Sequence, residues 1–183
     1  MSSRPSVLAH ICLPALLLLG VSARAEAPAA SAPAETSVDD NGHFVVKFPG
    51  AVQRSSVPVD TPVGKVTMNV VSHEAGIIAY MIIYSDYPAG SVAKSGGPDK
   101  VCENASKGAV GSVSGTIRTS TACQLGDVTG LEIVADIPSK NMTARLRFFV
   151  VGDRLYQVMY IGPPGQEASP AVMNYFESFR LLR

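Results

Sequence analysis

The sequence has no excess of charge of either sign. It contains 15 lysine and arginine side chains against 15 aspartate and glutamate side chains, so its formal net charge is zero. A nucleic-acid-binding protein usually carries a clustered basic surface that neutralises phosphates. No such cluster is present in the sequence, so we expect no nucleic-acid partner.

The motifs of common hydrolases and nucleotide-binding proteins are also missing. Residues 111–115 come nearest to Gly-x-Ser-x-Gly, but Val113 occupies the nucleophile position. No Gly-Lys-Ser/Thr follows these glycines to hold a phosphate. His73 precedes Glu74, but no second histidine follows four residues on, as a zinc-protease motif requires. We therefore predict a protein that is not an enzyme, with no catalytic residue, metal ligand or cofactor.

Long hydrophobic runs are confined to the N-terminus. Arg4 is followed by an apolar run over residues 7–21, and Ala23-Arg24-Ala25 has the small-x-small pattern of a signal peptidase site. The run is shorter than the roughly 20 residues of a membrane-spanning helix, although a retained anchor is the alternative. The pattern predicts that residues 1–25 are a signal peptide cleaved near Ala25-Glu26. We expect a periplasmic or secreted protein with no transmembrane segment in the mature chain.

The mature chain divides into a linker and one domain. Residues 26–40 begin with a stretch rich in alanine, proline and serine that lacks the bulky side chains needed to offset chain ordering, which predicts a disordered linker. Residues 41–183 are numerous enough to form one hydrophobic core. We expect a single domain and a monomer.

Cleavage of the signal peptide would leave two cysteines, Cys102 and Cys123. Cysteines of exported proteins usually pair. A predicted helix over residues 98–113 and a predicted strand over residues 116–125 can direct both thiols to one helix–sheet interface, with Cys123 on the same side of its strand as Ile117. This pattern predicts a Cys102–Cys123 disulfide. Two buried free thiols are the alternative.

Hydrophobic periodicity predicts an α+β domain. Alternation and β-branched residues indicate strands over residues 43–48, 55–58, 64–72, 77–84, 116–125, 130–137, 142–151 and 154–161. A second helix is expected to begin at Pro170, with Ser169 as its N-cap. Residues 77–84 are apolar on both faces, as in a central strand covered on both sides. We expect a mostly antiparallel sheet of about six to seven strands with helices packed on its faces.

Two arginines lie on one face of the predicted hairpin formed by residues 142–151 and 154–161. Arg145 and Arg147 are two residues apart, and Glu132 is placed to be their partner on the neighbouring strand. A structural pairing role is favoured over an anion-binding site.

Several segments resemble the PsbP-like fold family. They are FVVKFPG (residues 44–50), the turn TPVG (61–64), the hairpin RLRFFVVGDRLYQVMYIG (145–162) and FESFRL (176–181). The family is named for an extrinsic photosystem II protein, and also contains a Ran-binding nuclear-transport factor and the bacterial periplasmic protein DcrB. The resemblance implies an α/β/α arrangement and a non-enzymatic role, since familiar members dock onto other proteins. No site residue of the family is matched here.

These observations favour an exported, non-catalytic binding or accessory protein of the bacterial cell envelope, which acts on another envelope protein through protein–protein contacts. A small-molecule or lipid carrier is the alternative, and it requires an apolar cavity between sheet and helix. A hydrolase is a third interpretation. It requires an acid, base or nucleophile that converges in a pocket, such as His73 beside a serine or carboxylate.

Overall fold

The computed structural model describes residues 35–61 and 64–182. The predicted signal peptide and residues 26–34 of the predicted linker lie outside the described residues. Within the described ranges, the helices lack the length and apolar character needed to cross a bilayer.

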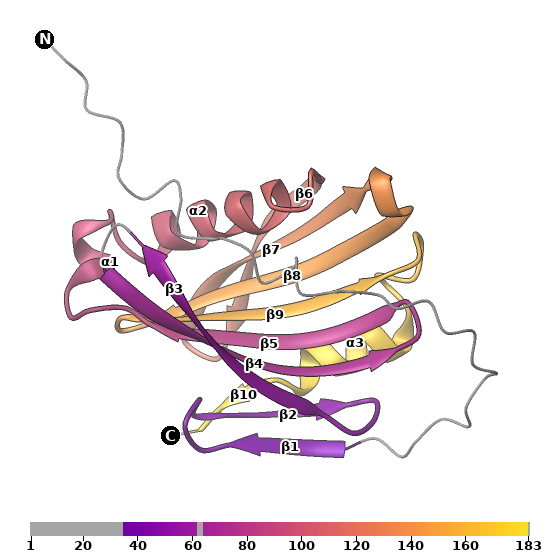
Figure 1. Cartoon of the computed structure of the whole chain (residues 1–183), viewed down its shortest axis with the longest axis horizontal. Coiled ribbons are helices and arrows are strands. Elements are labelled where there is room, and N and C mark those ends of the chain that lie inside the picture. Colours follow the sequence, from indigo (N-terminus) through magenta and orange to yellow (C-terminus); the bar gives the residue numbers. More distant parts are fainter. Residues whose placement is uncertain (1–34, 62–63, 183) are drawn as a thin grey trace, which may run out of the picture.

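The described residues contain a main sheet of seven antiparallel strands in the order β3-β4-β5-β9-β8-β7-β6 (Figure 1). The strands are β3 (Gln53–Thr61), β4 (Gly64–Ala75), β5 (Ile78–Asp86), β6 (Thr116–Leu125), β7 (Val128–Ile137), β8 (Met142–Val151) and β9 (Arg154–Gly162). Every neighbouring pair is antiparallel. The prediction of a mostly antiparallel α+β sheet is confirmed.

A smaller sheet joins the two ends of the described chain. Its order is β1-β2-β10, from β1 (Glu35–Asp39), β2 (Phe44–Phe48) and β10 (Arg180–Leu181). The linker was predicted to extend to residue 40, but residues 35–39 pair with β2 in register. After the helix that begins at Pro170, Phe179 is already extended, and Leu182 N–H donates to the His43 carbonyl.

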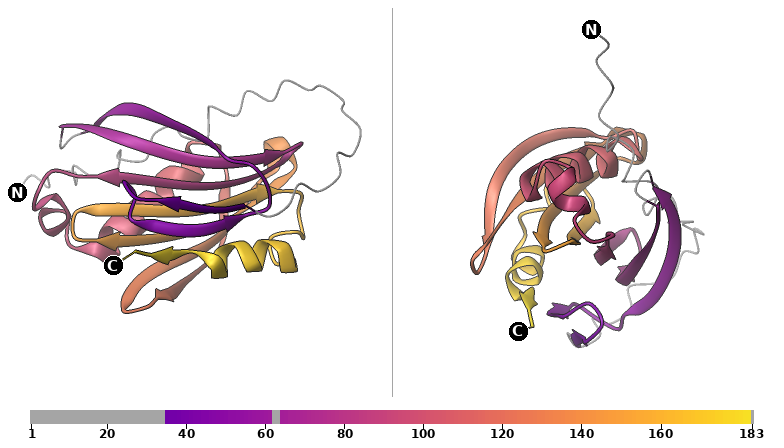
Figure 2. Two further views of the ribbon diagram at one scale, coloured as in Figure 1. Left: turned by 90° about the horizontal axis from the view of Figure 1, so that it is seen from below. Right: turned by 90° about the vertical axis from the view of Figure 1, so that its left-hand side faces the viewer.

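Helices cover both faces of the main sheet (Figure 2). The helix α2 (Pro98–Gly111) packs against β7 and β8 on one face, with the short α1 (Ser91–Lys94) before it. The helix α3 (Pro170–Ser178) and the small sheet cover the other face, and α3 contacts β2. A 3-10 turn (Pro138–Lys140) joins β7 to β8.

Two hydrophobic cores lie on opposite faces of the sheet, because the central strands β5 and β9 are buried on both sides. The core under α2 is largely aliphatic, and from these two strands it takes Ala79, Met81, Ile83, Leu155, Met159 and Ile161. The core under α3 is aromatic, and from the same strands it takes Tyr80, Ile82, Tyr84, Tyr156, Val158 and Tyr160. The prediction of a doubly covered strand over residues 77–84 is therefore confirmed from residue 78 onward, whereas Ile77 lies in the turn before β5 and is exposed.

The aromatic core connects the small sheet to the main sheet. Phe179 lies against Phe44 of β2 at 5.5 Å and against Phe149 of β8 at 6.3 Å between ring centroids. Tyr175 of α3 donates its hydroxyl to the Met81 carbonyl at 2.8 Å. These contacts hold the last helix and last strand on the sheet.

Because Gly130 has no side chain, the Phe149 ring can pack directly against its backbone. A Cβ atom at Gly130 would overlap the Phe148 carbonyl oxygen and the Phe149 ring. We expect Gly130→Ala to lower the free energy of unfolding by about 1–3 kcal/mol, because the strand must shift to relieve the overlap. Urea unfolding followed by circular dichroism measures this change.

The matched control is Thr129→Ala at the exposed neighbouring position, which should change stability by no more than about 0.5 kcal/mol. Equal stability of the Gly130→Ala variant and the wild type would contradict the proposed packing.

Candidate binding groove

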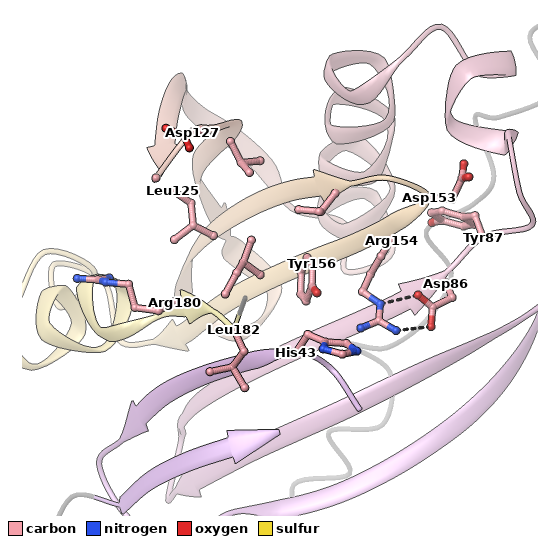
Figure 3. A pocket seen from close by; sticks show the side chains of 14 residues that line it. His43, Asp86, Tyr87, Leu125, Asp127, Asp153, Arg154, Tyr156, Arg180 and Leu182 are labelled. Carbon is pink, nitrogen blue, oxygen red and sulfur yellow. Dashed lines mark hydrogen bonds and ion pairs between the residues drawn. The ribbon is translucent and has the colours of Figure 1, made fainter. Parts of the chain in front are cut away.

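A groove of about 770 Å³ lies where the small sheet meets one end of the main sheet (Figure 3). We call it the β10 groove. It is lined by His43, Asp86, Tyr87, Leu125, Gly126, Asp127, Val128, Val151, Asp153, Arg154, Tyr156, Arg180, Leu181 and Leu182. Two hairpin tips form part of its wall, one between β6 and β7 and the other between β8 and β9. Gly126 and Gly152 have φ values of 59° and 61°, which allow these tight turns.

Arg154 is the central polar residue of the groove. Its Nε and Nη2 atoms donate to both carboxylate oxygens of Asp86 at 2.5 and 2.8 Å. Its Nη1 atom donates to the Asn41 carbonyl at 2.9 Å, and its guanidinium lies 5.4 Å from the Tyr84 ring centroid. The hydrogen bonds to Asp86 raise the pKa of Arg154 above its usual range. Arg154 thus joins the turn before β2 to the end of β5.

Asp153 shapes the neighbouring segment. Its carboxylate accepts hydrogen bonds from Gly90 N–H at 2.8 Å and Val92 N–H at 3.0 Å. The N–H groups of Val92 and Gly90 lower the pKa of Asp153, so the carboxylate stays ionised. The side chain therefore caps the first turn of α1.

The walls of the groove are largely apolar. Val151 and Leu182 are 40% and 36% exposed, an unusual degree for large hydrophobic side chains of this protein. Leu125, Val128 and Leu181 pack partly against the aromatic core and present their remaining surface here. Acidic and basic side chains also line the groove, which therefore has apolar walls and a charged rim.

The three polar groups Tyr156, Arg154 and Asp153 of the groove are already engaged within the protein. Tyr156 donates its hydroxyl to the Gly42 carbonyl at 2.8 Å, and burial raises its pKa. Arg154 is held by Asp86, and Asp153 is held by backbone N–H groups. A general acid or base must be able to exchange its proton with a substrate. These interactions favour binding over proton transfer in the groove.

His73 does not line the β10 groove. Its Nδ1 atom donates to the Ala51 carbonyl at 2.8 Å, and its ring lies over Gly50. His43 lines the groove. The carboxylate of the nearby Asp39 is engaged elsewhere, because it accepts from Gly42 N–H and pairs with Arg54. In the described part of the chain, no group of three or more histidine, cysteine, aspartate or glutamate side chains could hold a metal ion.

Arg145, Arg147 and Glu132 form the predicted ion-paired cluster. Glu132 lies opposite Arg147, and its two carboxylate oxygens accept from Arg145 Nη2 at 2.8 Å and Arg147 Nε at 2.5 Å. Both guanidinium groups also lie over the Phe176 ring of α3, at 5.5 and 5.1 Å from its centroid. The cluster therefore serves a structural pairing role and supports the docking of α3.

Glu132 gives the cluster a pH dependence. Burial alone would raise the pKa of Glu132, but the hydrogen bonds from Arg145 and Arg147 outweigh it and the pKa is lowered. A lowered pKa in the folded state contributes stability above the unfolded pKa of about 4.3, and this stability is lost as the pH falls through the folded pKa.

We expect Glu132→Gln to destabilise the protein by about 2 kcal/mol at neutral pH, because two charge-assisted hydrogen bonds are weakened. The difference from the wild type should begin to shrink as the pH falls below the unfolded pKa of about 4.3, and should disappear only below the lowered pKa of Glu132 in the folded protein. Urea unfolding across this pH range measures both effects, and Glu74→Gln at an exposed position is the control. A difference that stays constant with pH would contradict the charge-based explanation.

Cys102 and Cys123 are free thiols in the structure, in contrast to the predicted disulfide. Cys102 belongs to the aliphatic core under α2, and its thiol donates to the Phe148 carbonyl at 3.6 Å. Cys123 packs against the aromatic core on the other face. A bulge between Ile117 and Thr119 reverses the alternation of β6, so Cys123 does not share a face with Ile117. The sequence-based argument assumed an unbroken strand.

Both thiols should be unreactive in the folded protein. Burial is the main cause that raises the pKa of Cys102 to about 12 and that of Cys123 to about 11. The thiolate is the form that reacts with alkylating reagents. Alkylation of the two thiols in the folded protein should therefore be slow at pH 8, and should become faster only as the pH approaches these pKa values.

In denaturant without reductant, alkylation of the chain that begins at Glu26 should modify two thiols, as counted by intact mass. The Cys123→Ser variant should show one. Labelling that requires prior reduction, with a mass gain of two hydrogens on reduction, would restore the predicted disulfide.

The cavity between α2 and the sheet has a volume of about 10 Å³. It is lined by Ala109, Val110, Val113, Ala135, Ile137, Ala144, Leu146 and Met159. This volume is about that of a single water molecule's site. The space that a lipid carrier would need is therefore filled by side chains at this interface.

The comparisons with known proteins identify a fold. No protein-family model matches the chain, and no curated protein matches it. The solution structure of cyanobacterial PsbP (CyanoP) from Synechocystis sp. PCC 6803 is similar, with a TM-score of 0.57 at 10% sequence identity. The match covers 87% of this chain and 98% of that chain. The chain has a PsbP-like fold. At this identity, the likeness concerns the fold and not the function.

Sequence reasoning did not find the β10 groove. Its lining comes from separate segments, which include the turn before β2, two hairpin tips and the C-terminal strand. The predicted strands over residues 142–151 and 154–161 were a usable signal, because the two-residue gap between them places Val151 and Arg154 on either side of a hairpin tip. No comparable pattern in the sequence indicated that β10 would pair with β2.

Proposed function

We propose that this chain is an exported, non-catalytic binding or accessory protein of the bacterial cell envelope. It holds a segment of another envelope protein in the β10 groove. The observation that carries the proposal is the open groove, with its apolar walls and its charged rim, in which Arg154 and Asp153 are held by hydrogen bonds within the protein.

The groove has the composition of a protein-docking surface. Protein interfaces combine an apolar centre with a polar rim. Here Val151 and Leu182 supply exposed apolar surface within the lining. Asp127 and Arg180 contribute opposite charges to the lining. The partner segment that fits this surface carries an apolar side chain between charged or polar residues.

The rigidity of the lining also supports binding. Arg154 and Asp153 hold the groove wall through hydrogen bonds to Asp86, Asn41 and the α1 backbone. A preformed surface loses less conformational entropy when a partner binds. The PsbP-like fold and the N-terminal sequence pattern are compatible with an accessory role outside the cytoplasm.

Site-specific photo-crosslinking tests the proposal in cells. A photoreactive amino acid at Val151 or Leu182 should give one discrete adduct with another envelope protein, identified by mass spectrometry. The same amino acid at Val38 or Ile77 is the matched control, since these side chains are 52% and 55% exposed outside the groove. Export is tested by recovering the chain from the periplasm and measuring its intact mass, which should equal that of a chain that begins at Glu26.

A groove-lining substitution supplies the second comparison. Leu182→Ser should abolish the adduct formed from Val151 because it removes apolar contact surface, while leaving the fold intact at this exposed position. Equal crosslinking from all four positions, or none from the groove, would overturn the proposed binding site.

A further inference from the structure

The edge strand β6 is an open end of the main sheet. It has ten residues, pairs with β7 on one side and ends the strand order of the described sheet. Its side chains are exposed except for Ile117, Cys123 and Leu125, which are half-buried. An edge strand presents a row of backbone N–H and C=O groups that another strand can pair with.

The two edges of the main sheet differ in their protection. At the opposite edge, β3 carries Arg54, Pro58 and Asp60, and charges and proline discourage pairing with another chain. In β6 the charged residue is Arg118, which its own chain holds through Asp136 at 3.4 Å and through Glu167. From residue 119 to residue 125, β6 has neither charge nor proline and stays in regular register with β7.

We propose that β6 pairs in antiparallel fashion with β6 of a second copy of this chain. The pairing joins the two main sheets into one continuous sheet around a two-fold axis. A two-fold interface uses the same surface on both copies, so the sequence of β6 must be complementary to itself.

The sequence of β6 meets this requirement in a register centred on Thr121. Thr121 then faces its own symmetry copy, and Ser120 faces Ala122. Threonine pairs are favourable across antiparallel strands. Arg118 faces Gln124 in this register, so no like charges oppose each other.

This inference is independent of the proposed function and replaces the sequence-based expectation of a monomer. Leu125, at the far end of β6, lines the β10 groove, whereas the pairing is centred four residues earlier. A failure of self-association therefore leaves the groove proposal intact, and a failure of groove crosslinking leaves this inference intact.

Sedimentation velocity of the whole purified chain tests the pairing. The wild type should shift from monomer to dimer as the protein concentration rises. Ser120→Glu/Ala122→Glu places two pairs of like charges across the axis, and should raise the dissociation constant at least about tenfold. The matched control is Gln53→Glu/Ser55→Glu, at exposed positions of the β3 edge, which should dimerise like the wild type.

A charge exchange tests the register. The Ser120→Lys/Ala122→Lys variant should also be monomeric by itself, but an equimolar mixture with the Glu double variant should form a heterodimer, since each Glu then faces a Lys. Circular dichroism confirms that all variants fold. A wild type that stays monomeric at every concentration, or a dimer that the Glu double variant does not weaken, would overturn the proposal.

Discussion

The aromatic face of the main sheet is the constraint on which the rest of the structure depends. Strands β5 and β9 are buried on both sides, so the sheet has two apolar faces that need cover. The helix α2 covers one of them with aliphatic contacts. The other carries large aromatic rings, and it is covered by segments from the two ends of the described chain, β1-β2 and α3-β10. Phe179 lies where these segments meet and contacts both sheets.

This way of covering the sheet also creates the β10 groove. The small sheet meets the main sheet at the end where the hairpin tips of β6–β7 and β8–β9 project. Arg154 crosses between the layers and is held by Asp86 and the Asn41 carbonyl. The apolar surface of Val151 and Leu182 stays exposed beside this contact. The groove is therefore a consequence of how the two layers meet, and its exposed apolar walls carry the proposal that it binds a partner.

Polar interactions refine this packing without replacing it. Glu132 forms ion pairs with both Arg145 and Arg147 beneath Phe176, so that charged side chains can lie beside an aromatic core. The bulge in β6 sends Cys123 to this aromatic face, while Cys102 stays under α2. The bulge between Ile117 and Thr119 thus separates the two cysteines onto opposite faces of the sheet and leaves them as free thiols.

Local residue patterns were enough to place most strands and helices, the hairpin between residues 142–151 and 154–161, the doubly apolar strand β5 and the pairing of Glu132 with Arg147. These features depend on residue periodicity and on neighbours that one hairpin brings together. Four features become visible only in the folded chain: residues 35–39 form a strand, β10 pairs with β2, Cys123 packs on the opposite face of the sheet from Cys102, and distant turns enclose a groove. Each of these depends on contacts between residues far apart in the chain or on a bulge that local alternation does not reveal.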